Sequence, residues 1–320
     1  MNEPDYHGAG HNTGWRSVAG VLLLDKPSGI TSSAAVQRVR RLLRAQKAGH
    51  TGTLDPMASG LLPICLGEAT KFSHLLLEAD KAYIATVRLG VTTTTGDLEG
   101  RITARRVVEV TPEAIERALK GFAGESLQTP PMHSALKRAG QRLYKLARAG
   151  SDVPRAPRSI VIHKLDLLGI EGDDLTIFVR CSKGTYVRVL AEDLGRVLGC
   201  GGCLSGLRRE GVGAFRLAEG AVSLERIERM APAERDALLL PADALVSSLP
   251  RLDLEPELAL RLSHGQSVAH RAVQDEGLAR IYGPGGIFLG VAEVKSQGEI
   301  VPRRLVSGAS IAAAAGPSIA

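Results

Sequence analysis

Asp55 is the side chain whose setting most suggests chemistry: it stands directly before Pro56 in a loop of glycines and threonines, residues 49–60. Glycines in such a loop let the backbone approach a substrate closely, and a proline restricts the residue before it to extended conformations. An ionised carboxylate held there could act as a nucleophile or as a general base. An Asp-Pro pair also opens many ordinary turns, so these residues alone leave a structural role open.

Two windows of the sequence carry cations almost exclusively, and the Asp55 loop lies between them. From Val36 to His50 there are five cations and no acid, and from Lys137 to Arg158 there are seven cations against a single aspartate. One such window is more often a solvated face. Two windows that flank one candidate loop, in a chain of net charge +6 and pI near 9.3, favour a polyanionic partner.

Composition limits the class of protein. A chain of 320 residues with 44% hydrophobic and 23% charged residues is expected to bury a core and to form two domains. No apolar run approaches the roughly 20 residues that a membrane helix requires. The polar, glycine-rich start of the chain is unlike a signal peptide, so we expect a cytoplasmic protein without a membrane segment.

The cysteines and glycine motifs do not point to a cofactor. Cys200 and Cys203 have the spacing of half a zinc site, but no second cysteine pair or His-x-x-x-His partner follows at zinc-site spacing. The glycine-rich segment 283–286 joins two strand-like pieces and lacks the Lys-Ser or Lys-Thr of a phosphate-binding loop. We therefore expect neither a metal nor a nucleotide cofactor.

The elements that must position Asp55 predict an α+β fold, with a mixed, mainly antiparallel sheet and flanking helices. Lys81–Leu89 alternates as a half-buried strand, and Arg158–Leu168 with Leu175–Cys181 reads as a hairpin. Helices are expected after a cap at Thr31 or Ser32, from Pro112, and over Thr185–Leu198.

The sequence pattern changes near residue 250, where a proline-containing stretch is followed by short strand-like pieces separated by glycine turns. We predict flexible tails at 1–18 and 309–320, a main domain at 19–249 and a small β domain at 250–308. The basic segment at about 133–158 is expected to be a polyanion-binding insertion in the main domain, with Lys137, Arg142 and Arg148 as contacts.

The loop around Asp55 resembles the catalytic loop of the TruB family of bacterial tRNA pseudouridine synthases. Further segments resemble the same family in the same order: Gly20–Pro27, Pro63–Lys71, Met132–Lys137, Cys181–Arg188 and Pro302–Val306. The resemblance spans about residues 20–306. It implies a pseudouridine synthase domain, a C-terminal module of the PUA type, and isomerisation of the uridine at the fifty-fifth position of tRNA, in the T loop.

The resemblance also assigns roles to single residues. Asp55 would be the essential nucleophile or base, Arg188 the guanidinium that keeps it ionised, and Tyr186 the group that removes the C5 proton. The target base must leave its stack, and Tyr83 would replace that stacking while Leu207 lines the base. Without the resemblance, Arg188 would be read as a surface cation and the tyrosines as packing residues. Substrate contacts are implied for His50, Lys26 and, beside them, Thr51.

Several alternatives stay open on the sequence. The carboxylate could attack the sugar carbon, attack C6 of the base, or take the 2′ proton to give a glycal. A related branch of the family modifies ribosomal RNA with a guide RNA, and a tRNA-folding chaperone is a second rival. We expect a stand-alone, monomeric enzyme that binds the T arm and acceptor end of tRNA and needs no guide RNA. Chaperone activity could accompany catalysis.

Overall fold

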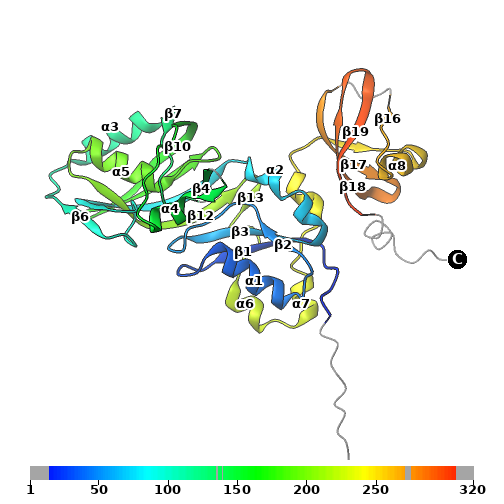
Figure 1. Cartoon of the computed structure of the whole chain (residues 1–320), viewed down its shortest axis with the longest axis horizontal. Helices are drawn as coiled ribbons and strands as arrows, with labels where there is room; N and C mark the ends of the chain where they lie inside the picture. The colour runs from blue at the N-terminus through cyan, green and yellow to red at the C-terminus, as the bar shows by residue number, and fades with distance from the viewer. Residues whose placement is uncertain (1–13, 135, 139, 271–274, 308–320) are drawn as a thin grey trace, which may run out of the picture.

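A mixed, mainly antiparallel sheet runs through the larger domain of the computed structural model, which describes residues 14–134, 136–138, 140–270 and 275–307 (Figure 1). Its strands follow the order β14-β1-β3-β12-β4-β11-β10-β7, with β2 paired to β3 and β13 paired to β12. Among the described strand pairs of this sheet, only β1–β14 and β12–β3 are parallel. The strands are β1 (Gly20–Lys26), β2 (Ala48–His50), β3 (Ser59–Leu66), β4 (Lys81–Leu89), β7 (Gly124–Gln128), β10 (Arg158–Glu171), β11 (Asp174–Cys181), β12 (Gly202–Val212), β13 (Phe215–Arg216) and β14 (Val222–Ser223).

Helices cover this sheet in two groups. At one end α1 contacts α6, and at the other α5 contacts β12 and α3 contacts β10 (Figure 1). The α+β prediction is thereby confirmed. The helices are α1 (Ser32–Leu42), α2 (Ser73–Leu77), α3 (Pro112–Phe122), α4 (Leu143–Arg148), α5 (Val187–Val197), α6 (Leu224–Arg229) and α7 (Pro232–Asp236), with 3-10 turns η1 (Gly67–Lys71) and η2 (Ala242–Val246). Two short hairpins, β5 (Val91–Thr93) with β6 (Ile102–Arg105) and β8 (Lys137–Arg138) with β9 (Gln141–Arg142), lie outside the main sheet.

Local sequence explains where these helices begin and how they face the sheet. The Thr31 hydroxyl accepts a hydrogen bond from Ala34 N at 3.1 Å, which caps α1. In α5 the apolar residues recur at helical spacing, and Leu190 and Leu194 are buried against the sheet. Gly195 lets this helix approach the sheet closely, because a Cβ there would lie 2.1 Å from Gly202 N. The last turn of α5 is therefore held close to the start of β12.

Two hydrophobic cores of the larger domain meet at the centre of the sheet. One lies under α3 and α5, and the other lies under α1 and α6. Tyr83 on β4 and Leu207 on β12 are half-buried side chains that pack against both cores. These two residues therefore mark the junction at which a site can open without interrupting either core.

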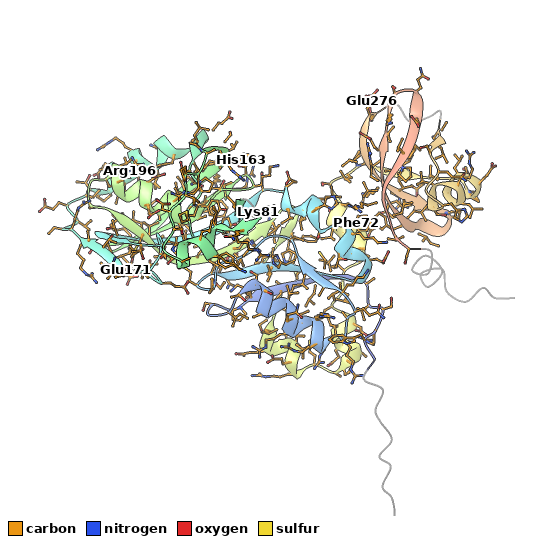
Figure 2. All side chains as sticks on the ribbon, viewed as in Figure 1. Phe72, Lys81, His163, Glu171, Arg196 and Glu276 are labelled. Atoms are coloured by element: carbon orange, nitrogen blue, oxygen red, sulfur yellow. The ribbon has the colours of Figure 1, made fainter. Side chains whose placement is uncertain are left out.

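The smaller domain is a five-stranded sheet of order β15-β17-β18-β19-β16. This sheet docks on the larger domain: the Phe72 and Phe288 rings lie 5.3 Å apart, and the Tyr282 hydroxyl donates to Asp243 Oδ2 at 2.6 Å. Phe72 lies where the two domains meet (Figure 2). Lys71 Nζ also donates to Leu305 O at 3.0 Å. The elements are β15 (Arg251–Asp253), α8 (Pro256–Ser263), β16 (Val268–Ala269), β17 (Gly277–Gly283), η3 (Pro284–Gly286), β18 (Ile287–Val294), η4 (Ser296–Gly298) and β19 (Glu299–Leu305).

The N-terminal segment is attached to the larger domain earlier than the predicted tail boundary at residue 18. Arg16 donates to both carboxylate oxygens of Asp236 at 2.7 Å, and its backbone pairs with Arg44 and Gln46. The guanidinium of Arg40 lies 4.4 Å from the centroid of the Trp15 ring. The rest of the predicted tails, residues 1–13 and 309–320, lies outside the described residues. In the described part of the chain, no helix is both long and apolar enough to cross a membrane.

Candidate active site

The loop that carries Asp55 connects β2 to β3 and is pinned to the start of α1. The Ser32 hydroxyl accepts a hydrogen bond from Leu54 N at 2.8 Å and donates to Leu54 O at 2.9 Å. On the other side of Asp55, Gly29 N donates to Pro56 O at 2.8 Å. Because both neighbours of Asp55 are held by the turn between β1 and α1, the carboxylate projects from a fixed backbone.

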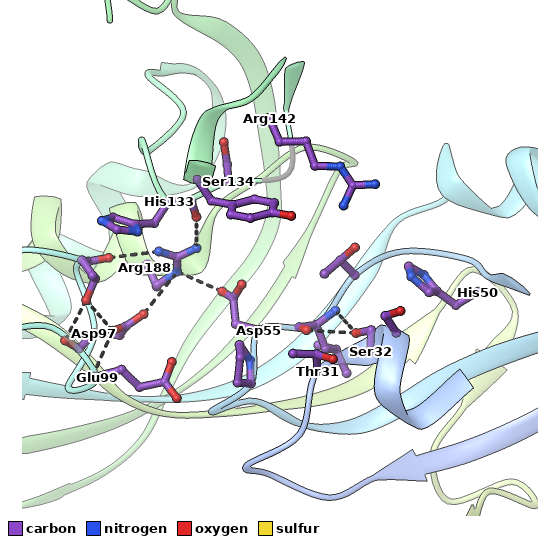
Figure 3. A pocket seen from close by; sticks show the side chains of 16 residues that line it. Thr31, Ser32, His50, Asp55, Asp97, Glu99, His133, Ser134, Arg142 and Arg188 are labelled. Carbon is purple, nitrogen blue, oxygen red and sulfur yellow. Dashed lines mark hydrogen bonds and ion pairs between the residues drawn. The ribbon is translucent and has the colours of Figure 1, made fainter. Parts of the chain in front are cut away.

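Arg188, in the first turn of α5, gathers three separate segments onto one buried guanidinium (Figure 3). Its Nε donates to Asp55 Oδ2 at 2.9 Å, Nη1 donates to Thr95 O at 3.0 Å, and Nη2 donates to His133 O at 2.8 Å. The side chain is only 5% exposed, whereas that of Asp55 is 37% exposed. The interpretation of Arg188 as a surface cation is therefore wrong, since its guanidinium fixes one oxygen of Asp55 and leaves the carboxylate accessible.

Asp97 completes this cluster and is not among the residues that the sequence singles out. Its side chain is 5% exposed, and its Oδ2 lies 3.6 Å from Arg188 Nε. Its Oδ1 accepts hydrogen bonds from the Thr95 hydroxyl at 2.5 Å and from Glu99 N at 3.1 Å. The pattern of residues 92–100 indicates only a polar loop between strands. An aspartate in a run of threonines and glycines is the signal that could have drawn attention to it.

A cavity of about 330 Å³ lies on one side of Asp55 and contains both predicted tyrosines. Tyr83 and Leu207 line it from the sheet, and Tyr186 lines it from the start of α5. Burial, the largest effect, raises the pKa of Tyr83 to about 12, although the Arg209 guanidinium beside its hydroxyl acts in the opposite sense. Burial also raises the pKa of Tyr186. This cavity has the ring surface and the size to receive one base.

Tyr186 is held in place through its backbone. Gln128, at the end of β7, accepts a hydrogen bond from Tyr186 N at 2.7 Å and donates to Tyr186 O at 3.1 Å. The oxygen and the nitrogen of the Gln128 side chain are thus both used, and the glutamine is 6% exposed. The sequence gives no sign of this role of Gln128, which orients Tyr186 and, two residues later, Arg188.

A second and wider cavity, of about 650 Å³, opens on the other side of Asp55 (Figure 3). It includes His50, Glu99 and Arg142, with Tyr144 on the same rim. His50 Nδ1 accepts a hydrogen bond from Gly52 N at 3.2 Å, and burial lowers the pKa of His50, as does the nearby Arg209. The histidine is therefore favoured in its neutral form. This cavity has room for more than one nucleotide beside the base cavity.

Two residues predicted to contact substrate lie beneath the Asp55 loop instead. Thr51 is fully buried and lines neither cavity beside Asp55. Lys26 is likewise fully buried, and its Nζ donates to Pro27 O and Ile30 O at 2.8 Å and reaches Pro56 O at 3.5 Å. Burial lowers the pKa of Lys26 to about 8, assisted by Arg209. Lys26 therefore supports the loop through the backbone carbonyls that its ammonium holds, one of them next to Asp55.

The predicted basic contacts belong to the β8–β9 hairpin and α4. Arg142 is exposed and borders the wider cavity (Figure 3). Lys137 lies in β8 and Arg148 at the end of α4, but the Arg148 side chain is outside the described part of the structure, as is that of Lys137. The Leu143 side chain is buried, and Leu143 N donates to Leu136 O at 2.8 Å, which closes the hairpin. Tyr144 N donates to Ser134 O at 3.1 Å, which attaches this segment to a residue that lines both cavities.

The cysteines are buried in the fold. Cys203 lies on β12 with no exposed surface, and the Cys200 thiol donates to Gly201 O at 3.4 Å. Among the residues that the structure describes, no group of three or more histidine, cysteine, aspartate or glutamate side chains could hold a metal ion.

Comparisons with known proteins agree along the chain. The family model described as the TruB family pseudouridylate synthase N-terminal domain matches residues 40–187. The tRNA pseudouridylate synthase B C-terminal domain matches residues 188–247, and the pseudouridine synthase II TruB C-terminal region matches residues 250–306.

Similar proteins cover nearly the same span. The tRNA pseudouridine synthase B of Aromatoleum aromaticum is 57% identical over 292 residues, which cover 91% of this chain and 94% of that protein. The protein of the same name from Methylobacillus flagellatus is 52% identical over 291 residues, covering 91% and 96%. Among solved structures, a chain in a Cbf5-Nop10-Gar1 complex matches with a TM-score of 0.70 and 26% identity, covering 91% of this chain and 86% of that one. This chain therefore belongs to the TruB family of pseudouridine synthases, which are isomerases.

Proposed function

We propose that this chain converts the uridine at the fifty-fifth position of tRNA, in the T loop, to pseudouridine, with Asp55 as the essential carboxylate. The observation that carries the proposal is the place of Asp55 between a base-sized cavity and a wider one, with Oδ2 held 2.9 Å from the buried Arg188. The relatives at 52–57% identity are tRNA pseudouridine synthases, which supports tRNA as the substrate.

The chemistry requires a single carboxylate. The bond from N1 of uracil to C1′ of the ribose must break, the detached uracil must turn, and C5 must join the same carbon. Asp55 can start this by attacking C1′, by attacking C6, or by removing the 2′ proton, and all three routes need its anionic form. The Arg188 guanidinium stabilises that negative charge in a site from which substrate excludes water.

The base cavity accounts for capture of the flipped uridine. Taking a base out of its stack costs a few kcal/mol unless a pocket replaces the lost stacking. Tyr83 offers a ring against one face, and Leu207 offers apolar surface beside it. Tyr186 lies in the same cavity as Asp55, and burial raises its pKa and favours the phenol. Its oxygen would take the C5 proton after the uracil has turned and C5 has joined C1′, in step with transfer of its own hydroxyl proton to water.

The remaining contacts would hold the T arm and the acceptor end. The basic segment around Arg142 borders the wider cavity, where phosphates on either side of the flipped nucleotide would lie. The C-terminal domain is docked through Phe72, Phe288 and Tyr282, which fixes its distance from Asp55. We therefore infer that this domain supports RNA farther along the tRNA.

Guide-RNA-dependent modification is the alternative within the family. One structural neighbour, with a TM-score of 0.67 and 25% identity, belongs to an H/ACA RNP bound to a substrate RNA. The tRNA enzymes are about twice as similar in sequence, and the match covers 94–96% of their own lengths. We therefore favour a stand-alone enzyme that acts on tRNA without a guide.

The test is incubation of the pure protein with unmodified tRNA, followed by mapping of pseudouridine by sequencing. The proposal expects one modified uridine, at the fifty-fifth position, and no dependence on added guide RNA. Absence of pseudouridine from the T loop would overturn the proposal. Activity that appears only with guide RNA would favour the alternative.

A further inference from the structure

Two buried cations line the base cavity, and neither has a carboxylate partner among the residues that the structure describes. Lys81 is 9% exposed and Arg209 is 1% exposed, and both line the cavity of about 330 Å³. Lys81 Nζ donates to Leu77 O and Ala79 O at 2.6 Å. Within the described chain, neither cation forms an ion pair with an acid.

Arg209 is held in a comparable way, by backbone carbonyls. Its Nε donates to Leu61 O at 2.7 Å and its Nη2 donates to Gly52 O at 3.1 Å. The two cations converge beneath Gly52, since a Cβ at that glycine would lie 3.7 Å from Arg209 Nη1 and 3.9 Å from Lys81 Cε. Arg209 also interacts with the Tyr83 hydroxyl at the end of the predicted stacking ring.

Burying a cation without a paired anion is unfavourable, because the desolvation of the charge is not offset. The lowering of the Lys81 pKa to about 8, mainly by burial and then by Arg209, is one consequence. A fold that maintains two such groups at one cavity creates a region of positive potential there. An anion that forms inside the cavity would be stabilised without any rearrangement of the protein.

The two cavities beside Asp55 differ in the sign of the charged side chains that line them. The base cavity is lined by three cations, Lys81, Arg188 and Arg209, against Asp55 alone. The acids that line the wider cavity are Asp55, Asp97 and Glu99, and its cations are Arg142 and Arg188. Burial and the neighbouring Asp97 raise the pKa of Glu99, which reflects this crowding of acids. Cations therefore outnumber acids around the base cavity, whereas acids outnumber cations around the wider cavity.

We propose that Lys81 and Arg209 stabilise the uracil anion that forms when the glycosidic bond breaks, Lys81 beside the base cavity and Arg209 as a positioning residue through Tyr83. This inference deepens the proposed function and rests on it. When the C1′–N1 bond breaks, its electron pair remains on N1 and spreads to O2 and O4 of uracil.

Charge is conserved along each route open to Asp55. In attack on C1′, a carboxylate oxygen forms the new bond while N1 departs with the pair. In glycal formation, Asp55 takes the 2′ proton and the C2′–H pair becomes the C1′–C2′ double bond as N1 departs. In attack on C6, the pair displaced by the new bond moves into the ring toward O4. One unit of negative charge passes from Asp55 to the base in every case, toward Lys81 and Arg209.

The test separates the charge of Lys81 from its structural hydrogen bonds. Lys81→Gln keeps a donor for the carbonyls of Leu77 and Ala79 but removes the charge, and Lys81→Arg keeps the charge. Each variant is given tRNA with uridine or with 5-fluorouridine at the target position, because fluorine stabilises the departing uracil anion. Cleavage of the N1–C1′ bond is measured in a single turnover at saturating enzyme, so that later proton loss from C5 does not enter.

We expect Lys81→Gln to slow cleavage of the uridine substrate on the order of a hundredfold, the scale found when one stabilising donor is removed from an oxyanion site. The loss with 5-fluorouridine should be several-fold smaller, and Lys81→Arg should retain most of the rate. Equal losses on both substrates, or a neutral variant as fast as the parent, would overturn the inference.

Two controls keep these outcomes interpretable. tRNA affinity and the midpoint of unfolding are measured for each variant, and Lys81→Met, which fills the same space, serves as a second neutral variant if glutamine is not tolerated. The parent enzyme must first modify the T loop. If the parent fails there, the proposed function is overturned. If the parent is active, the cleavage rates of the variants test only the role of Lys81.

Discussion

Arg188 Nε lies 2.9 Å from Asp55 Oδ2, and these two residues are 133 positions apart in the chain. The contact leaves Oδ1 of Asp55 free of this guanidinium and directs the accessible part of the carboxylate toward both cavities. The geometry makes Arg188 a clamp on the reacting group, since its other nitrogens are occupied by Thr95 O and His133 O.

Asp55→Asn should bind tRNA within a few-fold of the parent and form no pseudouridine. The amide is nearly isosteric and can still accept from Arg188, but it has neither the negative charge nor useful nucleophilicity. Filter binding with unmodified tRNA and a single-turnover assay give the two readings. Residual activity above about one per cent of the parent would show that Asp55 is not the essential group.

Asp97→Asn should slow the chemical step and leave tRNA affinity nearly unchanged. Asp97 contacts Arg188 beside Asp55, and losing its charge lets the guanidinium shift, where a displacement of about 1 Å can cost on the order of a hundredfold in rate. Asp193→Asn is a matched control, because Asp193 lies on the same helix as Arg188 and pairs with Arg196 away from the cavities. Equal rates for the two variants would contradict the role given to Asp97.

Tyr83→Ala and Tyr186→Phe should fail in different ways. Loss of the Tyr83 ring removes a stacking surface worth about 1 to 3 kcal/mol and should weaken capture of the target nucleotide. Tyr186→Phe keeps its ring but loses the group proposed to take the C5 proton, so it should stall after glycosidic cleavage. Cleavage and completed pseudouridine are scored separately for each variant. If both variants bound tRNA more weakly to the same degree, these assignments would be incorrect.

The sequence located those parts of the site that lie in continuous segments. Asp55, Tyr83 and Tyr186 each stand in a stretch with its own pattern, whereas Leu207 was implied by the resemblance alone. The structure places all four around one pair of cavities. The fold class followed from hairpins and helix caps, which are local signals.

The features that the sequence did not predict depend on contacts between distant residues. The burial of Arg209 and Lys81 could not be anticipated, because polar positions of an alternating strand are ordinarily exposed. Asp97 acts through Arg188, which is 91 positions away, and Gln128 acts through Tyr186, which is 58 positions away. The burial of Thr51 and Lys26 could not be anticipated either, because the sequence does not show which side of a loop faces the solvent.

Lys81→Met should become less stable relative to the parent as pH rises from about 8 to 10. The pKa of Lys81 in the folded protein is about 8, lowered by burial and Arg209 and raised in smaller measure by Cys181 and Asp80. The pKa of a lysine in the unfolded chain is about 10.4. Between these values the unfolded parent binds more protons, so the parent gains stability from Lys81 with rising pH and the variant does not.

Chemical denaturation of both proteins at several pH values measures this difference, in which the titrations of the cysteines and other lysines cancel. A gap that stays constant with pH would mean that Lys81 is not held with a lowered pKa. Single-turnover cleavage by the parent should decline over the same window, because the neutral amine no longer stabilises an anion, and Lys81→Arg should reduce that decline.

Arg142→Ala combined with Arg148→Ala should weaken tRNA binding at moderate salt with little change in turnover at saturating tRNA. Arg142 borders the wider cavity, Arg148 ends the short helix that follows it, and phosphate binding by this segment would supply affinity without reading bases. Removing one cation that neutralises a phosphate should flatten the plot of log affinity against log salt by roughly 0.7 to 0.9, so the slope should fall by about one to two.

The control is Arg226→Ala with Arg229→Ala on α6, which removes the same charge from exposed residues that line neither cavity. A salt titration of tRNA binding compares the three proteins. Parallel lines for the parent and the first variant would show that this segment does not touch the RNA backbone, and a flattened line for the α6 variant would mean that net charge alone sets the slope.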